Sequence, residues 1–107
     1  MSDLSVANAL PVFASELQES LSSQGRHDLA SQIPTLPLVD RCRCGDNFCA
    51  TFYRAKKPKG AYGAGHSNLV VESQEGMIIL DLVDDQIRCI EVLYRADVRE
   101  ALFAVLP

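Results

Sequence analysis

The sequence predicts one α+β domain over residues 1–107, with helices packed on a five-stranded, mainly antiparallel meander sheet. Three observations predict this fold class. Apolar residues recur every three or four positions before residue 34, they then alternate with a period of two, and the helical spacing returns near residue 97. We therefore expect an N-terminal helical segment over about 3–33, a sheet over about 36–95 and a C-terminal helix over about 97–106. A chain of 107 residues has room for a single hydrophobic core.

The main N-terminal helix is predicted by one apolar stripe. Its members share the spacing of a helix face and are Leu10, Phe13, Ala14, Leu17 and Leu21. Pro11 suits the first helical turn, where a backbone N–H is not needed. Gly25 is expected to end the helix, because glycine adopts the left-handed conformation of a helix end at little cost.

The first hairpin contains three of the four cysteines, in the stretch RCRCGDNFC at 41–49. Alternation begins at Leu38, the residues at 45–47 are typical of a turn, and the segment FCATFY at 48–53 predicts the returning strand. A two-residue loop would place Cys44 opposite Cys49, whereas a three-residue loop would turn Cys49 to the other side. The sequence leaves this register open.

The last three strands are predicted at 68–72, 77–83 and 87–94, with Asp84 and Asp85 as the final turn. That turn pairs Leu82 with Ile87, and it also pairs Asp81 with Arg88. One face then carries Ile78, Leu80, Leu82, Ile87, Cys89 and Leu93, and the other carries Met77, Ile79, Ile90 and Val92. Because the helices cover only one of two apolar faces, we expect a homodimer.

Charge and hydropathy exclude several classes of function. A net charge of −4 makes nucleic-acid binding unlikely, since phosphates require a basic surface. No apolar run has the roughly 20 residues of a membrane span, and the N-terminus lacks the pattern of a secretory leader. We therefore expect a cytoplasmic protein without membrane association, in which cysteines are thiols or metal ligands rather than disulfides.

A resemblance adds to this interpretation. The run CRCGDNFCATFY at 42–53, with its pattern C-x-C-G-x3-C-A-T-F-Y, resembles a family of small uncharacterised bacterial proteins, a domain of unknown function. The segments GMIILD at 76–81 and IEVLYR at 90–95 resemble a strand pair of the same family. The resemblance covers about the C-terminal two thirds of the chain. It implies a compact α+β domain and supplies no catalytic residue.

The cysteines allow three interpretations. Cys42, Cys44 and Cys49 offer three thiolates for zinc, and His66 is the candidate for the fourth ligand. Alternatively, these cysteines are buried structural side chains. A redox or nucleophilic thiol is the third interpretation, but the C-x-x-C motif is missing, and strand alternation places Arg41 and Arg43 on the opposite face.

Other candidate site residues are fewer. Glu91 shares its predicted face with core side chains, so it needs a partner or belongs to a site. Lys57 and Lys59 lie in the glycine-rich segment KKPKGAYGAGHS at 56–67, which has the composition of a phosphate-binding loop but is followed by no helix. A solvated connection is the simpler interpretation of that segment.

The sequence therefore favours a non-enzymatic interaction module that acts as a homodimer and needs no cofactor. A zinc protein that uses Cys42, Cys44 and Cys49 is the alternative. A cysteine nucleophile assisted by His66 is a third hypothesis, and it would be the only enzymatic one.

Overall fold

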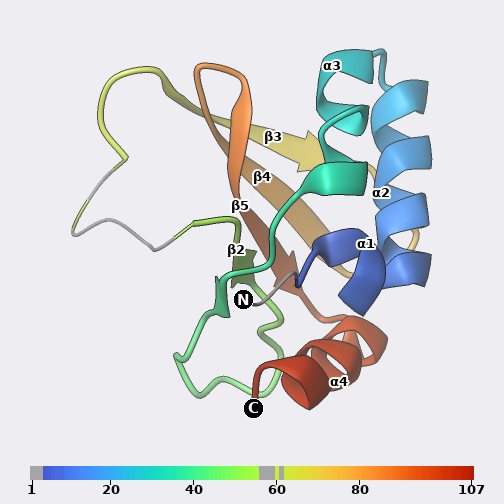
Figure 1. Cartoon of the computed structure of the whole chain (residues 1–107), viewed down its shortest axis with the longest axis vertical. Coiled ribbons are helices and arrows are strands. Elements are labelled where there is room, and N and C mark those ends of the chain that lie inside the picture. The colour runs from blue at the N-terminus through green and yellow to red at the C-terminus, as the bar shows by residue number, and fades with distance from the viewer. Residues whose placement is uncertain (1–3, 56–59, 61) are drawn as a thin grey trace.

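The computed structural model describes residues 4–55, 60 and 62–107. The predicted α+β class with a five-stranded antiparallel sheet is confirmed (Figure 1). In chain order the elements are α1 (Val6–Ala9), α2 (Pro11–Ser23), α3 (His27–Ala30), the 3-10 helix η1 (Ile33–Thr35), β1 (Asp40–Arg41), β2 (Phe52–Tyr53), β3 (His66–Val71), β4 (Met77–Val83), β5 (Gln86–Leu93) and α4 (Ala96–Val105). Lys57 and Lys59 lie outside the described residues.

The five strands are arranged in the order β1-β2-β5-β4-β3, and every neighbouring pair is antiparallel. The three long strands β3, β4 and β5 form a meander. The short hairpin of β1 and β2 joins this meander at β5, where Phe52 lies opposite Ile90. The cysteine-rich hairpin is therefore at the edge of the sheet opposite β3.

The N-terminal helices cover one face of the sheet, which we call the core face (Figure 1). The predicted stripe of α2 is buried there, and the ring of Phe13 meets the ring of Phe52 edge-on at a centroid distance of 6.2 Å. Gly25 follows the helix with a φ of +79°, as the sequence predicts. Burial of each large apolar side chain contributes roughly 2 kcal/mol, so this face supplies most of the stabilisation.

The register between β4 and β5 differs from the prediction beyond the turn. Leu82 lies opposite Ile87 as predicted, but an irregularity next to Asp81 shifts every later pair by one residue. Asp81 is therefore opposite Cys89, not Arg88. A β-bulge of this kind places two residues of one strand against one of its partner, so side chains beyond it change face.

This shift reverses the predicted faces of β5 after Arg88. Ile90 and Val92 are buried in the hydrophobic core, whereas Cys89, Glu91 and Leu93 lie on the other face, which we call the outer face. The core face of β4 and β5 then carries only apolar side chains, namely Ile78, Leu80, Leu82, Ile87, Ile90 and Val92. The bulge thus removes the predicted conflict of a carboxylate on the core face.

The free edge of the sheet at β3 is partly occupied by a side chain. The amide of Gln24, just after α2, donates a hydrogen bond to the carbonyl of Val70 at 3.1 Å and accepts one from the N–H of Glu72 at 2.8 Å. Gln24 therefore makes the two backbone contacts that a neighbouring strand would make at this position.

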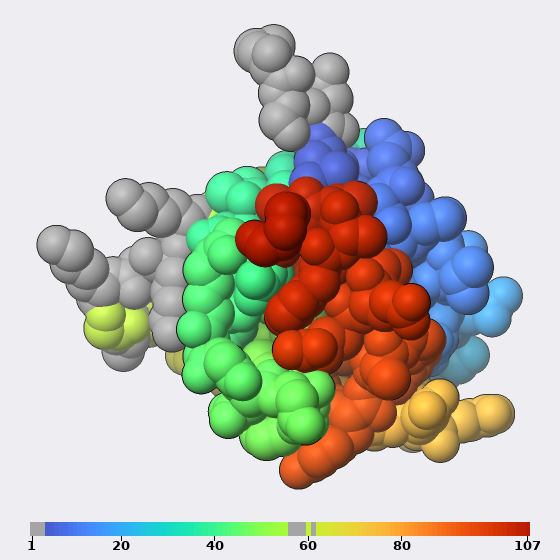
Figure 2. Space-filling view, turned by 90° about the horizontal axis from the view of Figure 1, so that it is seen from below, coloured from blue at the N-terminus to red at the C-terminus, as the bar shows by residue number. Residues whose placement is uncertain are grey.

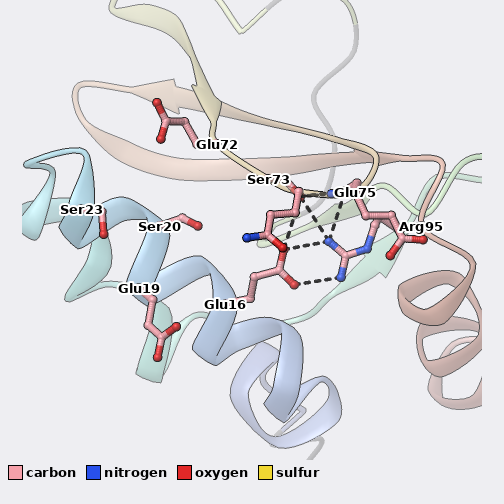
Figure 3. A pocket seen from close by; sticks show the side chains of 9 residues that line it. Glu16, Glu19, Ser20, Ser23, Glu72, Ser73, Glu75 and Arg95 are labelled. Carbon is pink, nitrogen blue, oxygen red and sulfur yellow. Dashed lines mark hydrogen bonds and ion pairs between the residues drawn. The ribbon is translucent and has the colours of Figure 1, made fainter.

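Arg95 connects three elements at the end of β5 (Figure 3). Its guanidinium donates to both carboxylate oxygens of Glu16 on α2, each at 2.8 Å, and to both oxygens of Asp97 on α4, each at 3.0 Å. Arg95 is only 6% exposed, so its charge depends on these partners. The hydrogen bonds that Arg95 donates to Glu16 and then to Asp97 raise the pKa of Arg95, and the bond from Arg95 lowers the pKa of Asp97.

Candidate metal centre

The three hairpin cysteines flank the two strands β1 and β2. After Arg41, the N–H of Cys42 still donates to the carbonyl of Thr51 at 2.8 Å, and a turn closes where the N–H of Cys49 donates to the carbonyl of Asp46 at 3.2 Å. Cys49 then bridges to the end of β5. The ladder of β1 and β2 covers only Asp40–Arg41 and Phe52–Tyr53, so the two registers that the sequence left open are not realised as strand pairing at Cys44 and Cys49.

The structure brings the three thiols together. The Sγ atoms of Cys42, Cys44 and Cys49 all lie within 4.8 Å of one another. Sulfur atoms bound to one tetrahedral zinc ion at 2.3 Å are about 3.8 Å apart, so side-chain movements of about 1 Å would complete the site. Cys49 is buried, Cys42 is half-buried and Cys44 is exposed, and the site therefore opens to solvent on the side of Cys44.

The environment of the thiols favours a thiolate at one position. Burial disfavours charge on Cys49, but hydrogen bonds from the hydroxyl and N–H of Thr51 and from the other two thiols outweigh burial and lower the pKa of Cys49. At Cys44 the N–H of Asp46 favours the thiolate, but interactions with Cys42 and Cys49 outweigh it and raise the pKa to about 11. Cys49 is thus the thiol that ionises more readily, and a metal ion would have to displace a proton from Cys44.

Three arginines line a cavity next to the thiol cluster. The hairpin lies directly against α4 (Figure 2), and between them is a cavity of about 210 Å³. It is lined by Arg41, Cys42, Arg43, Cys44, Gly45, Asp46, Cys49, Arg99 and Phe103. The predicted placement of Arg41 and Arg43 away from the cysteines is wrong, because the chain leaves the regular strand after Arg41 and alternation ends there. Nearby positive charge favours thiolates.

Two residues of this cavity belong to α4 and were not found from the sequence. The guanidinium groups of Arg41 and Arg99 both pack on the ring of Phe103, at 3.8 and 4.2 Å from its centroid. Arg41 also donates to the carbonyl of Leu106 at 2.6 Å. The spacing of four between Arg99 and Phe103 on a helix was the available signal, but nothing in the sequence relates α4 to the hairpin.

The structure does not bring His66 to the thiols. His66 begins β3, opposite Val83, and its Nε2 lies 3.0 Å from Oδ1 of Asp81 on the outer face. Asp81 therefore pairs with His66 and not with Arg88 as predicted. No further histidine, cysteine or carboxylate in the described part of the chain joins the three-thiol group. The fourth position of a tetrahedral ion would be open.

Cys89 and Glu91 lie on the outer face of the sheet. Cys89 is 3% exposed, and burial followed by the nearby charges of Asp81 and Glu91 raises its pKa, so its thiol is a poor nucleophile. Glu91 is half-buried on the outer face and has an interaction partner.

A separate cavity of about 710 Å³ between α2 and the β3–β4 turn is lined mainly by glutamates and serines around Arg95 (Figure 3).

Comparison with known proteins gives no relative: no protein-family model, no curated protein and no solved structure matches the chain. Among the described helices, none has the length and apolar character needed to cross a membrane. The resemblance to a family of small bacterial proteins stays a prediction. What the structure defines is an α+β domain with three clustered thiols at the edge of its sheet.

Proposed function

We propose that this protein binds a thiophilic metal ion, zinc in the first place, through Cys42, Cys44 and Cys49. The observation that carries the proposal is the convergence of three Sγ atoms to within 4.8 Å on one short hairpin. Thiolate ligands select zinc and other soft ions over magnesium or calcium. The lowered pKa of Cys49 and the three arginines that line the adjacent cavity support thiolate ligation at this site.

The site has the features of exchangeable binding rather than of a structural zinc centre. Structural sites are closed by four protein ligands, whereas sites that exchange ligands retain an open position. Here Cys44 is exposed, and none of the three cysteines belongs to the hydrophobic core. The hairpin contributes Ala50 and Phe52 of its returning strand to the core cluster, but none of its cysteines. Removal of the metal by a chelator is therefore expected to leave the domain folded.

Replacing Cys49 with serine should abolish tight zinc binding. Loss of an outer-shell contact alone typically weakens metal affinity by about 10–100-fold, so loss of a ligand should weaken it by about 100-fold or more. Elemental analysis of the purified wild-type protein should give one zinc per chain, and competition with a chromogenic chelator should give the affinities.

The matched control is Cys89→Ser, which removes a buried thiol from the outer face and should leave zinc affinity unchanged. Thermal unfolding of both variants verifies that they fold. Equal zinc content in the wild-type protein and in a variant with serine at all three hairpin positions would refute the proposal.

A second candidate function is that of a non-enzymatic interaction module acting as a homodimer. The observation that favours it is an apolar strip on the outer face, which no helix of the described chain covers. Val70 is 65% exposed and Met77 is 48% exposed, and half-buried Ile79 and Leu93 lie beside them in the ladder. Contiguous apolar surface of this kind marks interaction sites.

Lysine at both Val70 and Met77 should therefore convert a dimer into a monomer, because two charges would be buried in the interface. Analytical ultracentrifugation over a wide range of protein concentrations measures this change. Val12→Lys is the control, since Val12 is 82% exposed on α2, away from the outer face. A wild-type protein that stays monomeric at the highest concentration would exclude the homodimer.

A further inference from the structure

The arginines beside the thiol cluster differ in their partners. Arg41 donates to the carbonyls of Leu106 and Cys42, and Arg43 donates to Asp40 and to the carbonyl of Pro107. Arg99 is different. Its Nε is buried and has no hydrogen-bond partner within the described residues, although its guanidinium is held against Phe103 and lines the same 210 Å³ cavity as the cysteines.

A buried donor without an acceptor is costly, and more so when the group is charged. Because the Nε–H group of Arg99 has no acceptor, it can donate a hydrogen bond to an acceptor that enters the cavity. A carboxylate suits it best, because the two oxygens match the parallel N–H groups of a guanidinium. The volume of the cavity limits such a ligand to a small molecule.

The thiol cluster adds a second requirement on the same ligand. A divalent ion on three thiolates retains one open position, and a soft ion prefers sulfur as the next donor. A molecule that carries both a thiol and a carboxylate satisfies the metal and Arg99 together. Surrounding positive charge from Arg41 and Arg43 also favours an anionic over a neutral thiol.

We propose that the open position of the bound metal accepts a small anionic thiol from solution, whose carboxylate is held by Arg99. The inference rests on the proposed metal binding at Cys42, Cys44 and Cys49. In this ligand exchange the thiol releases its proton to solvent, its sulfur replaces a metal-bound water molecule, and no electron is transferred.

The test compares two thiols on protein loaded with cobalt(II), whose visible spectrum reports a change in its fourth ligand. Mercaptoacetate carries a carboxylate, and 2-mercaptoethanol is its neutral counterpart. Mercaptoacetate should bind the wild-type protein about tenfold more tightly or better, as expected for a hydrogen bond to a charged group. Arg99→Gln should remove this preference, with both thiol affinities measured on the cobalt-saturated variant. Arg88→Gln, on β5 far from α4, should behave as wild type, and Arg99→Lys should retain part of the preference.

The outcomes separate the two proposals. If the protein binds cobalt but shows no preference between the thiols, or if Arg99→Gln retains the preference, the inference is wrong and the metal site stands. Extraction of the metal by mercaptoacetate from the wild-type protein would also overturn the inference. Failure of the protein to bind any metal, measured first by elemental analysis, would overturn both. Thermal unfolding shows whether Arg99→Gln is destabilised. If it is, the preference for mercaptoacetate is compared between the wild-type protein and Arg99→Lys, and an undiminished preference in Arg99→Lys overturns the inference.

Discussion

Replacing Glu16 with alanine is expected to lower the free energy of unfolding by about 3 kcal/mol. Glu16 accepts two hydrogen bonds of 2.8 Å from Arg95, whose side chain is only 7% exposed. Removing one partner of a buried ion pair costs about 3–5 kcal/mol. The lower end applies because the Glu16 side chain is itself 31% exposed. Urea denaturation measures the change.

Glu19 provides the matched control for this experiment. It is on the same helix and lines the same cavity as Glu16, but it is exposed (Figure 3). Glu19→Ala should therefore change the free energy of unfolding by less than about 0.5 kcal/mol. Equal losses in the two alanine variants would show that the bidentate contact with Arg95 contributes nothing specific. Replacing both Glu16 and Arg95 with methionine should recover part of the lost stability, because no charge then stays buried without a partner.

Replacing Gly76 with alanine is expected to destabilise the fold by about 3 kcal/mol. Gly76 lies in the turn before β4 with a φ of +73°, where a side chain costs about 1–2 kcal/mol. A Cβ at this position would also be 2.5 Å from the carbonyl oxygen of Leu93 and 2.7 Å from Cγ of Arg95. Neither atom can move away easily, since Leu93 is held in the sheet and Arg95 is held by its ion pairs.

Gly25→Ala separates the backbone cost of a side chain at positive φ from the steric cost of the Cβ. Gly25 has nearly the same backbone conformation, with a φ of +79°, but its Cβ would meet no atom within 4 Å. We expect this variant to lose about 1 kcal/mol, the backbone cost alone. The difference between the two midpoints of chemical denaturation then measures the steric part at Gly76. Similar losses at both positions would contradict the tight packing of the turn against Leu93 and Arg95.

The fold was predictable from the sequence because its main signals are local. The apolar stripe of α2, the stop at Gly25 and the alternation of β4 are set by residues close to one another in the chain. The bulge in β5 was not predictable in the same way. A register without a bulge paired Asp81 with Arg88, so it matched opposite charges as well as apolar residues across the two strands. The only signal against a register without a bulge was Glu91, because that register placed its carboxylate among core side chains. The bulge instead turns Ile90 and Val92 toward the core and Glu91 to the outer face.

The candidate site was predictable only in part, for a similar reason. Three cysteines lie within eight residues, so the sequence offered their meeting as one alternative, although one of the two possible hairpin registers turned Cys49 away. Contacts between distant segments have no such local signal. The sequence assigned His66 to the thiols because it was the nearest free ligand in the chain, but the strand order places it with Asp81. Arg99 and Phe103 approach the hairpin only because α4 folds back beside it.

The side chain of Gln24 has a consequence for how molecules of this protein encounter one another. An edge strand with unpaired backbone groups can pair with a strand from a second molecule, and repeated addition of strands leads to fibrils. At β3 the carbonyl of Val70 and the N–H of Glu72 already form hydrogen bonds with Gln24. This edge of the sheet therefore has fewer free backbone groups for an incoming strand. The glutamine is thus a safeguard against polymerisation through this edge of the sheet.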